Sequence, residues 1–179
     1  MRCFVAVKLP IEIKDYLFDL QKKIRSENAK INFVHKKNLH LTLKFLGELN
    51  EKEVEEVKRI LRKVKFKKFE VYLDEVGVFP NEGYIRVVWV GLKPVRKVFE
   101  LQQKIDSELL TIFSKDEKFS AHLTIGRVKF IKNTESFLEV LKNLEVKNKS
   151  FLVDKSYLIE SELRKEGPKY SDLDVFELN

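Results

Sequence analysis

Two copies of one short pattern constrain the fold of this 179-residue chain more than any other feature of its sequence. The segment FDLQKKI at Phe18–Ile24 aligns with FELQQKI at Phe99–Ile105, and five of the seven positions are identical. A His-Leu-Thr tripeptide follows each segment, first at His40–Thr42 and again at His122–Thr124. One such tripeptide arises easily by chance, but two at the same place in a repeat indicate two structurally related units.

Each unit is predicted to form a strand, a helix that begins near a proline, and a second strand. The first unit, at about residues 2–47, has a strand at Arg2–Leu9, a helix from Ile11 to about Arg25 after Pro10, and a strand at Asn38–Gly47. The second unit, at about residues 84–129, has a strand at Tyr84–Leu92, a helix from Pro94 to about Phe113, and a strand at Ala121–Val128. We expect the two units to form two lobes of one domain.

The rest of the chain adds further elements around the two units. We expect a helix capped by Asn50 and ending near Lys65, a strand at Phe69–Phe79, a turn at Pro80–Gly83, a short helix at Asn133–Leu144, and strands near Phe151–Ser161 and Asp172–Leu178. No linker rich in Gly, Pro or Ser divides the chain, and neither a P-loop nor a dinucleotide-binding fingerprint occurs. About four helices among many strands favour a single α+β domain over residues 1–179 rather than a Rossmann order.

Composition narrows the class of protein. The chain has 35 Lys and Arg against 28 Asp and Glu, a formal charge of +7, which favours polyanionic partners such as nucleic acid but equally fits a solvated lysine-rich surface. Its one cysteine, Cys3, excludes an internal disulfide and a Cys-based zinc cage. No apolar run approaches the roughly 18 residues of a membrane span, and no signal peptide is recognisable, so we expect a cytoplasmic protein.

The two His-Leu-Thr segments lie in predicted strands, where alternate side chains point to the same face. His40, Thr42 and Lys44 therefore share one face of the first strand, and His122 and Thr124 share one face of the second. The residues between them are apolar and suit burial against a core. If the lobes are related by a pseudo-twofold axis, both His-Thr pairs converge on one cleft.

Two imidazoles that face a cleft are suited to general acid–base catalysis. Near neutral pH one imidazole accepts a proton from water while the other, protonated, donates a proton to a leaving oxygen. The hydroxyls of Thr42 and Thr124 are donors for non-bridging phosphate oxygens. This chemistry needs no metal or other cofactor, and two histidines without an adjoining carboxylate supply too few ligands for a zinc site. We therefore predict His40 and His122 as catalytic residues.

Three further residues are candidates for contact with a substrate. Arg127 would point away from Thr124 in a regular strand, but a bulge at Gly126 would re-aim its guanidinium toward a phosphate; the alternative is a surface salt bridge. Lys44 lies on the histidine face by its spacing and is a weaker candidate for phosphate binding, with a purely structural position as the alternative. His35 precedes the first His-Leu-Thr strand, has no counterpart in the repeat, and is expected on the surface or at the cleft rim.

The segments HLTLKFLG at His40–Gly47 and HLTIGR at His122–Arg127 resemble the two signature motifs of the two-histidine phosphoesterases. Within that superfamily the chain is similar to the bacterial and archaeal RNA 2′,3′-cyclic phosphodiesterases, also called RNA 2′-5′ ligases. The similarity extends to Arg2–Pro10, Val76–Pro80 and Gly167–Tyr170, so that it covers nearly the whole chain.

The resemblance implies a bilobal α+β fold, in which two pseudo-symmetric antiparallel-sheet lobes with flanking helices surround a central cleft. It also implies metal-independent opening of a terminal 2′,3′-cyclic phosphate on RNA, which leaves a 2′-phosphate. His40 matches the general acid that protonates the 3′ oxygen, and His122 matches the general base that activates water. Thr42, Thr124 and Arg127 match residues that bind the phosphate.

The chain departs from the family pattern at Ala121, where relatives usually carry proline, and at Gly126, where alanine is more usual. Neither change removes a reacting group. Three alternatives stay open: RNA 2′-5′ ligation at the same site, a smaller cyclic phosphate as substrate, and an RNA-binding module without catalysis. The expected partner is RNA with cyclic phosphate ends, such as tRNA fragments, and the expected state is a monomer without membrane association or a disulfide partner.

Overall fold

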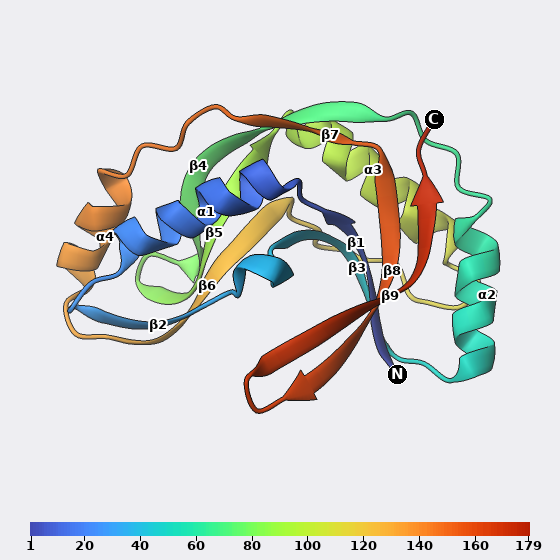
Figure 1. The fold of residues 1–179 in the computed structure, drawn as a ribbon, viewed down its shortest axis with the longest axis horizontal. Helices are drawn as coiled ribbons and strands as arrows, with labels where there is room; N and C mark the ends of the chain where they lie inside the picture. Colours follow the sequence, from blue (N-terminus) through green and yellow to red (C-terminus); the bar gives the residue numbers. More distant parts are fainter.

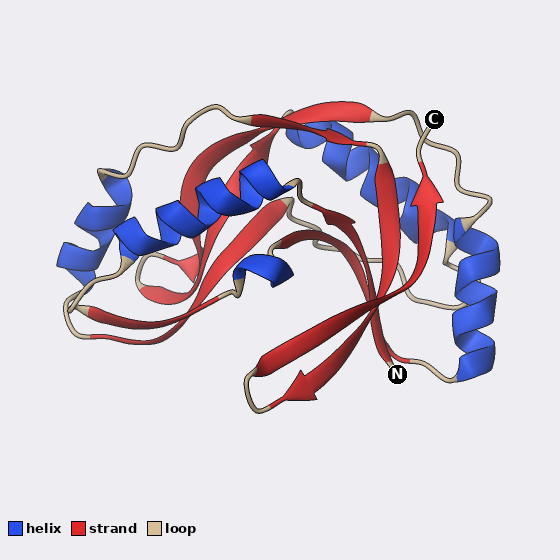
Figure 2. Cartoon of the chain, in the orientation of Figure 1, coloured by secondary structure: helices blue, strands red, loops and turns tan.

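The computed structural model describes residues 1–179, and its two antiparallel sheets and four α-helices confirm the predicted α+β class. Sheet A has the strand order β3-β1-β8-β9, and sheet B has the order β2-β6-β5-β4-β7. In Figure 1 the two sheets lie side by side, α2 and α4 lie at opposite ends of the molecule, and the β8–β9 hairpin projects from sheet A. The outer end of that hairpin is not covered by a helix (Figure 2).

The bounds of the elements are as follows. Sheet A contains β1 (Arg2–Lys8), β3 (His40–Glu48), β8 (Lys155–Arg164) and β9 (Gly167–Glu177). Sheet B contains β2 (Ala29–Phe33), β4 (Phe69–Asn81), β5 (Tyr84–Lys93), β6 (His122–Ile131) and β7 (Ser150–Val153). The α-helices are α1 (Ile11–Ile24), α2 (Glu51–Leu61), α3 (Val95–Glu108) and α4 (Thr134–Lys142), and Lys36–Asn38 forms a single 3₁₀ turn, η1. None of the helices has the length and hydropathy needed to span a bilayer.

The repeated segments occupy equivalent places in the two sheets. β1 and β3 are neighbours in sheet A and are joined through α1, β2 and η1; β5 and β6 are neighbours in sheet B and are joined through α3. Each helix also reaches the other unit, because α1 packs against β6 and α3 packs against β3. The strands β3 and β6, which carry the two His-Leu-Thr segments, also lie against each other.

Local sequence explains where several elements begin. Pro10 and Pro94 directly precede α1 and α3, where a proline costs no intrahelical hydrogen bond. Asn50 caps α2 as predicted: its side chain accepts from the backbone N–H of Glu53, and the Glu53 carboxylate accepts from the backbone N–H of Asn50.

The structure corrects the predicted elements in five places. β2 was not predicted, and the two helices expected to end near Lys65 and Phe113 end at Leu61 and Glu108. The single strand expected at Phe151–Ser161 is two strands, β7 and β8, which belong to different sheets. The last strand begins at Gly167, because a positive φ of 114° at this glycine turns β8 directly back into β9.

One cluster of 38 buried hydrophobic side chains includes residues of both sheets and all four α-helices, so the sheets share a core. β1 is buried on both faces: Val5 and Val7 belong to this core, while Phe4 and Ala6 pack with Ile159 on the other face of sheet A. That other face forms one wall of a cleft, which Phe4 lines although its side chain is buried.

Candidate active site

Both His-Thr pairs line one cleft of about 1770 Å³. His40 and Thr42 reach it from β3, and His122 and Thr124 reach it from β6. All four residues are half-buried, whereas Leu41 and Leu123 between them are fully buried in the core. The alternation predicted for the two strands therefore holds over these residues and places four polar side chains on the walls of one cavity.

A β-bulge follows the threonine in each strand. In β3 the pairing with β1 passes from Thr42, opposite Ala6, to Lys44, opposite Val5, so that Leu43 is the additional residue. Because two consecutive residues then point away from the cleft, Leu43 and Lys44 are both buried.

The bulge in β6 lies at the equivalent place. The pairing with β5 passes from Thr124, opposite Trp89, to Gly126, opposite Val88, so that Ile125 is the additional residue. Arg127 consequently returns to the cleft face and lines the cavity. The predicted bulge is thus present, with Ile125 rather than Gly126 as the additional residue, and it re-aims the arginine in the expected direction.

The same geometry overturns the prediction for Lys44. Its side chain is only 2 % exposed and lies behind the sheet, where it forms ion pairs with Asp106 and Asp116. Lys44 is absent from the cleft lining, and Phe45, which is 71 % exposed, occupies the cleft face in its place. The prediction was wrong because it assumed an unbroken two-residue alternation, which the bulge at Leu43 interrupts.

His40 is held in one orientation by two hydrogen bonds. Its Nδ1 donates to the carbonyl oxygen of Asn38 at 2.7 Å, because a carbonyl oxygen only accepts. In the neutral ring Nε2 then accepts from the Thr42 hydroxyl, also at 2.7 Å. Burial lowers the pKa of His40, an effect partly opposed by the hydrogen bond to Asn38 and reinforced by the charges of Lys14, Arg127 and His122.

His122 is oriented in the same way but is more open. Its Nδ1 donates to the carbonyl oxygen of Ser120 at 2.7 Å, which leaves Nε2 without a protein partner. Burial lowers the pKa of His122; the hydrogen bond to Ser120 opposes this shift, and the charge of Arg127 adds to it. In its neutral form each imidazole carries its proton on Nδ1; Nε2 of His122 then has a free lone pair, as a general base requires, whereas Nε2 of His40 is hydrogen-bonded to Thr42.

Aromatic rings support both imidazoles, and none of these rings is among the site residues predicted from the sequence. Phe4 and Tyr170 contact the His40 ring, with centroids 5.1 and 5.4 Å away. Phe79 and Trp89 contact the His122 ring at 4.9 and 6.3 Å. These rings limit rotation of the imidazoles and provide the apolar surroundings that lower their pKa values.

A sequence signal for one of these contacts exists in the segment Val76–Pro80. The Trp89 ring lies so close to the backbone of Gly77 that a Cβ there would come within 2.1 Å of it. Only glycine, which has no Cβ, leaves room for the ring at this position. A glycine inside a predicted strand is a recognised sign that another group approaches the backbone closely. The sequence alone does not say which ring approaches.

The remaining candidates, Arg127 and His35, also line the cleft. Burial lowers the pKa values of His40 and His122, and the charge of Arg127 adds to both shifts; burial raises the pKa of Tyr170, and the charge of Arg127 opposes that shift. The guanidinium therefore acts on groups from both sheets. Among the residues of the chain, no three His, Cys, Asp or Glu side chains form a cluster suited to a metal ion.

The walls of the cleft carry mainly positive charge. One acidic residue, Glu166, lines the cavity, against eight basic ones: Arg2, Arg25, Lys30, Lys37, Arg127, Arg164, Lys165 and Lys169. Arg164, Lys165 and Lys169 lie at or beside the β8–β9 turn on one side, and Lys30 lies on β2 on the other. Such a cavity attracts polyanions and concentrates them near the histidines.

Comparison with known proteins finds a family model, relatives and solved structures that are similar to this chain. The family model "LigT like Phosphoesterase" matches the chain twice, at residues 7–89 and 90–170. An RNA 2′,3′-cyclic phosphodiesterase of Methanothermobacter thermautotrophicus is 35% identical over 182 residues, which cover 99% of both chains. One of Archaeoglobus fulgidus is 36% identical over 178 residues, covering 99% of this chain and 100% of the relative. The crystal structure of TT0787 of Thermus thermophilus has a TM-score of 0.81 at 28% identity, covering 99% of this chain and 98% of that one.

Proposed function

Because the chain belongs to the LigT-like phosphoesterase family, we propose that it hydrolyses 2′,3′-cyclic phosphate ends of RNA with His40 and His122 as acid and base. Its relatives over nearly the full length are named RNA 2′,3′-cyclic phosphodiesterases, which makes the chain a phosphodiesterase by family. The observation that carries the assignment of residues is the single cleft into which two imidazoles and two threonine hydroxyls project.

The reaction needs one proton acceptor and one proton donor on opposite sides of phosphorus. Nε2 of His122 takes a proton from water as the water oxygen forms a bond to phosphorus. The bond between phosphorus and the 3′ oxygen breaks, and Nε2 of His40, protonated at the start, donates its proton to that oxygen. The products are a 2′-phosphate and a free 3′-hydroxyl, and proton exchange with solvent returns both imidazoles to their initial states.

Thr42, Thr124 and Arg127 are the groups proposed to hold the phosphate. The Thr42 hydroxyl lies 2.7 Å from Nε2 of His40, so it occupies the position where a non-bridging oxygen would approach the acid. Arg127 contributes the guanidinium charge, which stabilises the additional negative charge that develops on the non-bridging oxygens in the transition state. The bound phosphate anion also raises the pKa of His40, which favours the protonated acid despite its burial.

RNA is the substrate class that best fits the walls of the cleft. The eight basic residues line a cavity much larger than a single phosphate group, and they extend from the β8–β9 turn to β2. A polynucleotide places several phosphates along such a surface, whereas a mononucleotide cyclic phosphate uses only the centre. We also propose that the enzyme acts in the cytoplasm on RNA ends such as those of tRNA fragments. We propose that it acts as a monomer, since one chain supplies the whole proposed catalytic set.

The test is hydrolysis of an oligoribonucleotide that ends in a 2′,3′-cyclic phosphate, with EDTA present. The wild-type protein is expected to turn over at an undiminished rate in EDTA and to leave only the 2′-phosphate. A product with a 3′-phosphate, or activity that EDTA abolishes, would contradict the proposed mechanism. RNA binding without turnover would instead support the binding-module alternative.

The pH dependence of kcat/KM provides a second readout of the same experiment. Activity rises with pH as His122 loses its proton and falls with pH as His40 loses its proton. Because burial lowers both pKa values below 6.5, kcat/KM is expected to peak on the acid side of pH 6.5. A maximum above pH 7 would contradict the assignment of the two histidines as the titrating pair.

RNA 2′-5′ ligation would use the same two imidazoles, with the 5′-hydroxyl of a second RNA in place of water. His122 would take the proton of that hydroxyl as its oxygen bonds to phosphorus, the bond from phosphorus to the 3′ oxygen would break with a proton from His40, and the 2′ oxygen would stay bonded to phosphorus in the 2′-5′ linkage. We place hydrolysis first, because the matched relatives are named as phosphodiesterases. Incubation of the cyclic phosphate with a second RNA that carries a 5′-hydroxyl measures the competing reaction directly.

A further inference from the structure

A buried ionic cluster lies directly behind the histidine strand of sheet A. Nζ of Lys44 donates to Oδ1 of Asp106 at 2.6 Å, to Oδ1 of Asp116 at 2.9 Å and to the carbonyl oxygen of Ser114 at 3.1 Å. All three ammonium protons therefore have acceptors. Lys44 and Asp106 are 2 % and 5 % exposed at their side chains, and Asp116 is 35 % exposed.

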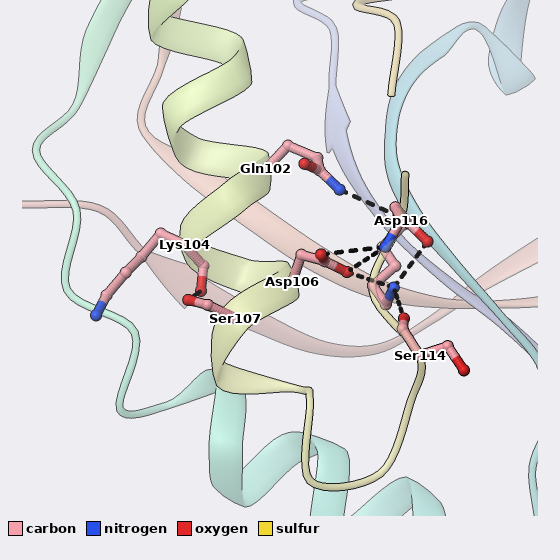
Figure 3. Close-up of polar contacts among 7 residues, drawn as sticks. Gln102, Lys104, Asp106, Ser107, Ser114 and Asp116 are labelled. Carbon is pink, nitrogen blue, oxygen red and sulfur yellow. Dashed lines mark hydrogen bonds and ion pairs between the residues drawn. The ribbon is translucent and has the colours of Figure 1, made fainter. Parts of the chain in front are cut away.

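Further hydrogen bonds tie the two aspartates to each other. The backbone N–H of Asp116 donates to both carboxylate oxygens of Asp106, and the side chain of Gln102 donates to Oδ2 of Asp116. Figure 3 shows Gln102 and Asp106 projecting from α3 toward Asp116, which lies in the loop beyond the helix. Burial by itself lowers the pKa of Lys44, but its hydrogen bonds and charge attraction to both aspartates outweigh burial and raise it, so the ammonium stays charged.

The cluster joins two segments that each end at a proposed catalytic residue. Lys44 follows Thr42 by two residues and His40 by four along β3. Asp116 precedes Ser120 by four residues in the loop that leads into β6, and the Ser120 carbonyl is the acceptor for Nδ1 of His122. The cluster is therefore the ionic connection between the strand that carries one histidine and the loop that orients the other.

Stability alone does not explain a buried salt bridge at this position. Replacement of a buried ion pair by apolar residues is often neutral or stabilising, because desolvation offsets most of the attraction between the charges. What a fully hydrogen-bonded cluster does provide is a fixed geometry between the elements that carry its members. Here those elements belong to the two different repeat units, β3 on one side and the α3–β6 loop on the other.

We propose that Lys44, Asp106 and Asp116 are positioning residues, which fix the placement of His122 relative to His40 by holding the α3–β6 loop against the bulge of β3. The proposal rests on the proposed function, since it concerns the geometry of the same two histidines. Loss of the cluster is expected to let the loop and the Ser120 carbonyl shift. In-line attack depends on the relative placement of acid and base, so such a shift lowers kcat more than it alters KM.

Two variants of different severity test the cluster. Lys44→Met removes the charge at nearly constant volume, and Asp116→Asn removes the charge of the most exposed partner while keeping its shape. Each is expected to lower kcat about tenfold to a hundredfold with KM almost unchanged. The double variant Lys44→Met/Asp116→Asn is expected to lose no more activity than Lys44→Met alone, because both changes break one connection.

The pKa of His122 can be measured without substrate by NMR of its ring protons. If the cluster has only a structural role, its loss should not change this pKa. In both variants the pKa of His122 is expected to rise toward its ordinary value, because a displaced loop admits water to the ring and burial, the largest cause of the lowered pKa, outweighs the opposing hydrogen bond to Ser120. The control for general loss of stability is Leu141→Ala, which removes a buried side chain of α4. Helix α4 lies at the opposite end of the molecule from α2 (Figure 1). It is expected to lower Tm while leaving kcat and the His122 titration unchanged.

The outcomes separate this proposal from the proposed function. If both variants keep the wild-type kcat and the wild-type His122 titration while Tm falls, the cluster is only structural and the proposal is wrong. Should Lys44→Met fail to fold, Asp116→Asn alone decides by the same two measurements. If the wild-type protein does not open a cyclic phosphate at all, the proposed function fails, yet the titration of His122 still reports whether the cluster positions its ring.

Discussion

The two histidine strands, β3 and β6, share a sequence motif, a bulge and a hydrogen-bonding scheme, and they differ in what covers them. Each holds its imidazole through an Nδ1–H bond to a carbonyl oxygen two residues earlier, Asn38 for His40 and Ser120 for His122. β3 is the edge strand of sheet A, whereas β6 is covered on its outer side by β2. The two halves of the proposed site are therefore similar toward the cleft and different behind it.

The difference begins at the two residues that follow the bulge. The bulge places Lys44 in β3 where β6 has Gly126, and Phe45 where β6 has Arg127. Behind β3, the Lys44 side chain reaches to α3 and its loop, whereas behind β6 the absence of a side chain at Gly126 lets Ile31 of β2 approach. The repeat thus uses one backbone geometry with two ways of anchoring it.

The helices show the same contrast. Gln21 of α1 and Gln102 of α3 occupy matching places in the repeated segments. The side chain of Gln21 donates to the carbonyl oxygen of Ile125, the bulged residue of β6, at 2.8 Å, while Gln102 donates to Asp116 in the ionic cluster. Each helix therefore stabilises the histidine strand of the other unit, once by a direct neutral hydrogen bond and once through buried charges.

The largest effect is expected from removing each imidazole in turn, with a substrate that separates their roles. His40→Ala and His122→Ala are each expected to lose about 10²–10⁴-fold in kcat. A cyclic phosphorothiolate with sulfur at the 3′ position loses a thiolate, which departs without protonation. It should restore turnover in His40→Ala and leave His122→Ala inactive, as measured by release of the free thiol.

Restored turnover in His40→Ala alone would show that the two halves of the proposed site have different catalytic roles. The wild-type protein on the oxygen and sulfur substrates is the control for the intrinsic reactivity of the thiolate. Restoration of His122→Ala alone would mean that acid and base are exchanged between β3 and β6. Equal restoration of both variants would contradict a division of labour between them.

A smaller effect is expected from the pair Arg127 and Phe45, which face the cleft from matching positions. Arg127→Met removes a charge-assisted contact to the phosphate worth about 1.5–3 kcal/mol, so kcat/KM should fall about 10- to 150-fold. Phe45→Leu keeps an apolar side chain on a largely exposed residue and is expected to change kcat/KM by about twofold or less. Steady-state kinetics on one oligonucleotide compares the two, and an equal loss in both would mean that the asymmetry of the walls has no bearing on phosphate binding.

The sequence was sufficient to predict the parts of the fold that follow a local pattern. Alternation of apolar and polar residues placed His40, Thr42, His122 and Thr124 on one face each, and the structure brings all four to one cleft. The repeat indicated that the two strands occupy equivalent positions. A glycine after the second motif also indicated the bulge that turns Arg127 toward the cleft.

The missed features depend on contacts between residues far apart in the chain. The bulge at Leu43 has no glycine to mark it, so the orientation of Lys44 was predicted wrongly. β2 is a five-residue strand whose pairing partner in β6 lies about a hundred residues later, and neither its length nor its alternation identifies it. The rings of Phe4, Phe79, Trp89 and Tyr170 look like ordinary core residues in the sequence, because only the folded sheets bring them to the histidines.

The smallest expected effect on activity, and a specific effect on stability, comes from Gly126→Ala. A Cβ at this position would lie 2.7 Å from Cγ2 of Ile31 and 3.4 Å from the ring of Phe33, so β2 must move for the methyl group to fit. Overpacking of this kind costs about 1–3 kcal/mol, which for a chain of this size is a fall in Tm of about 2–12 °C. Ile31→Ala removes the obstructing atom, so the double variant Gly126→Ala/Ile31→Ala should be more stable than the sum of the two single losses predicts. Thermal unfolding of the four proteins measures this coupling, and strict additivity would mean that Gly126 is not the residue that lets β2 cover the histidine strand of sheet B.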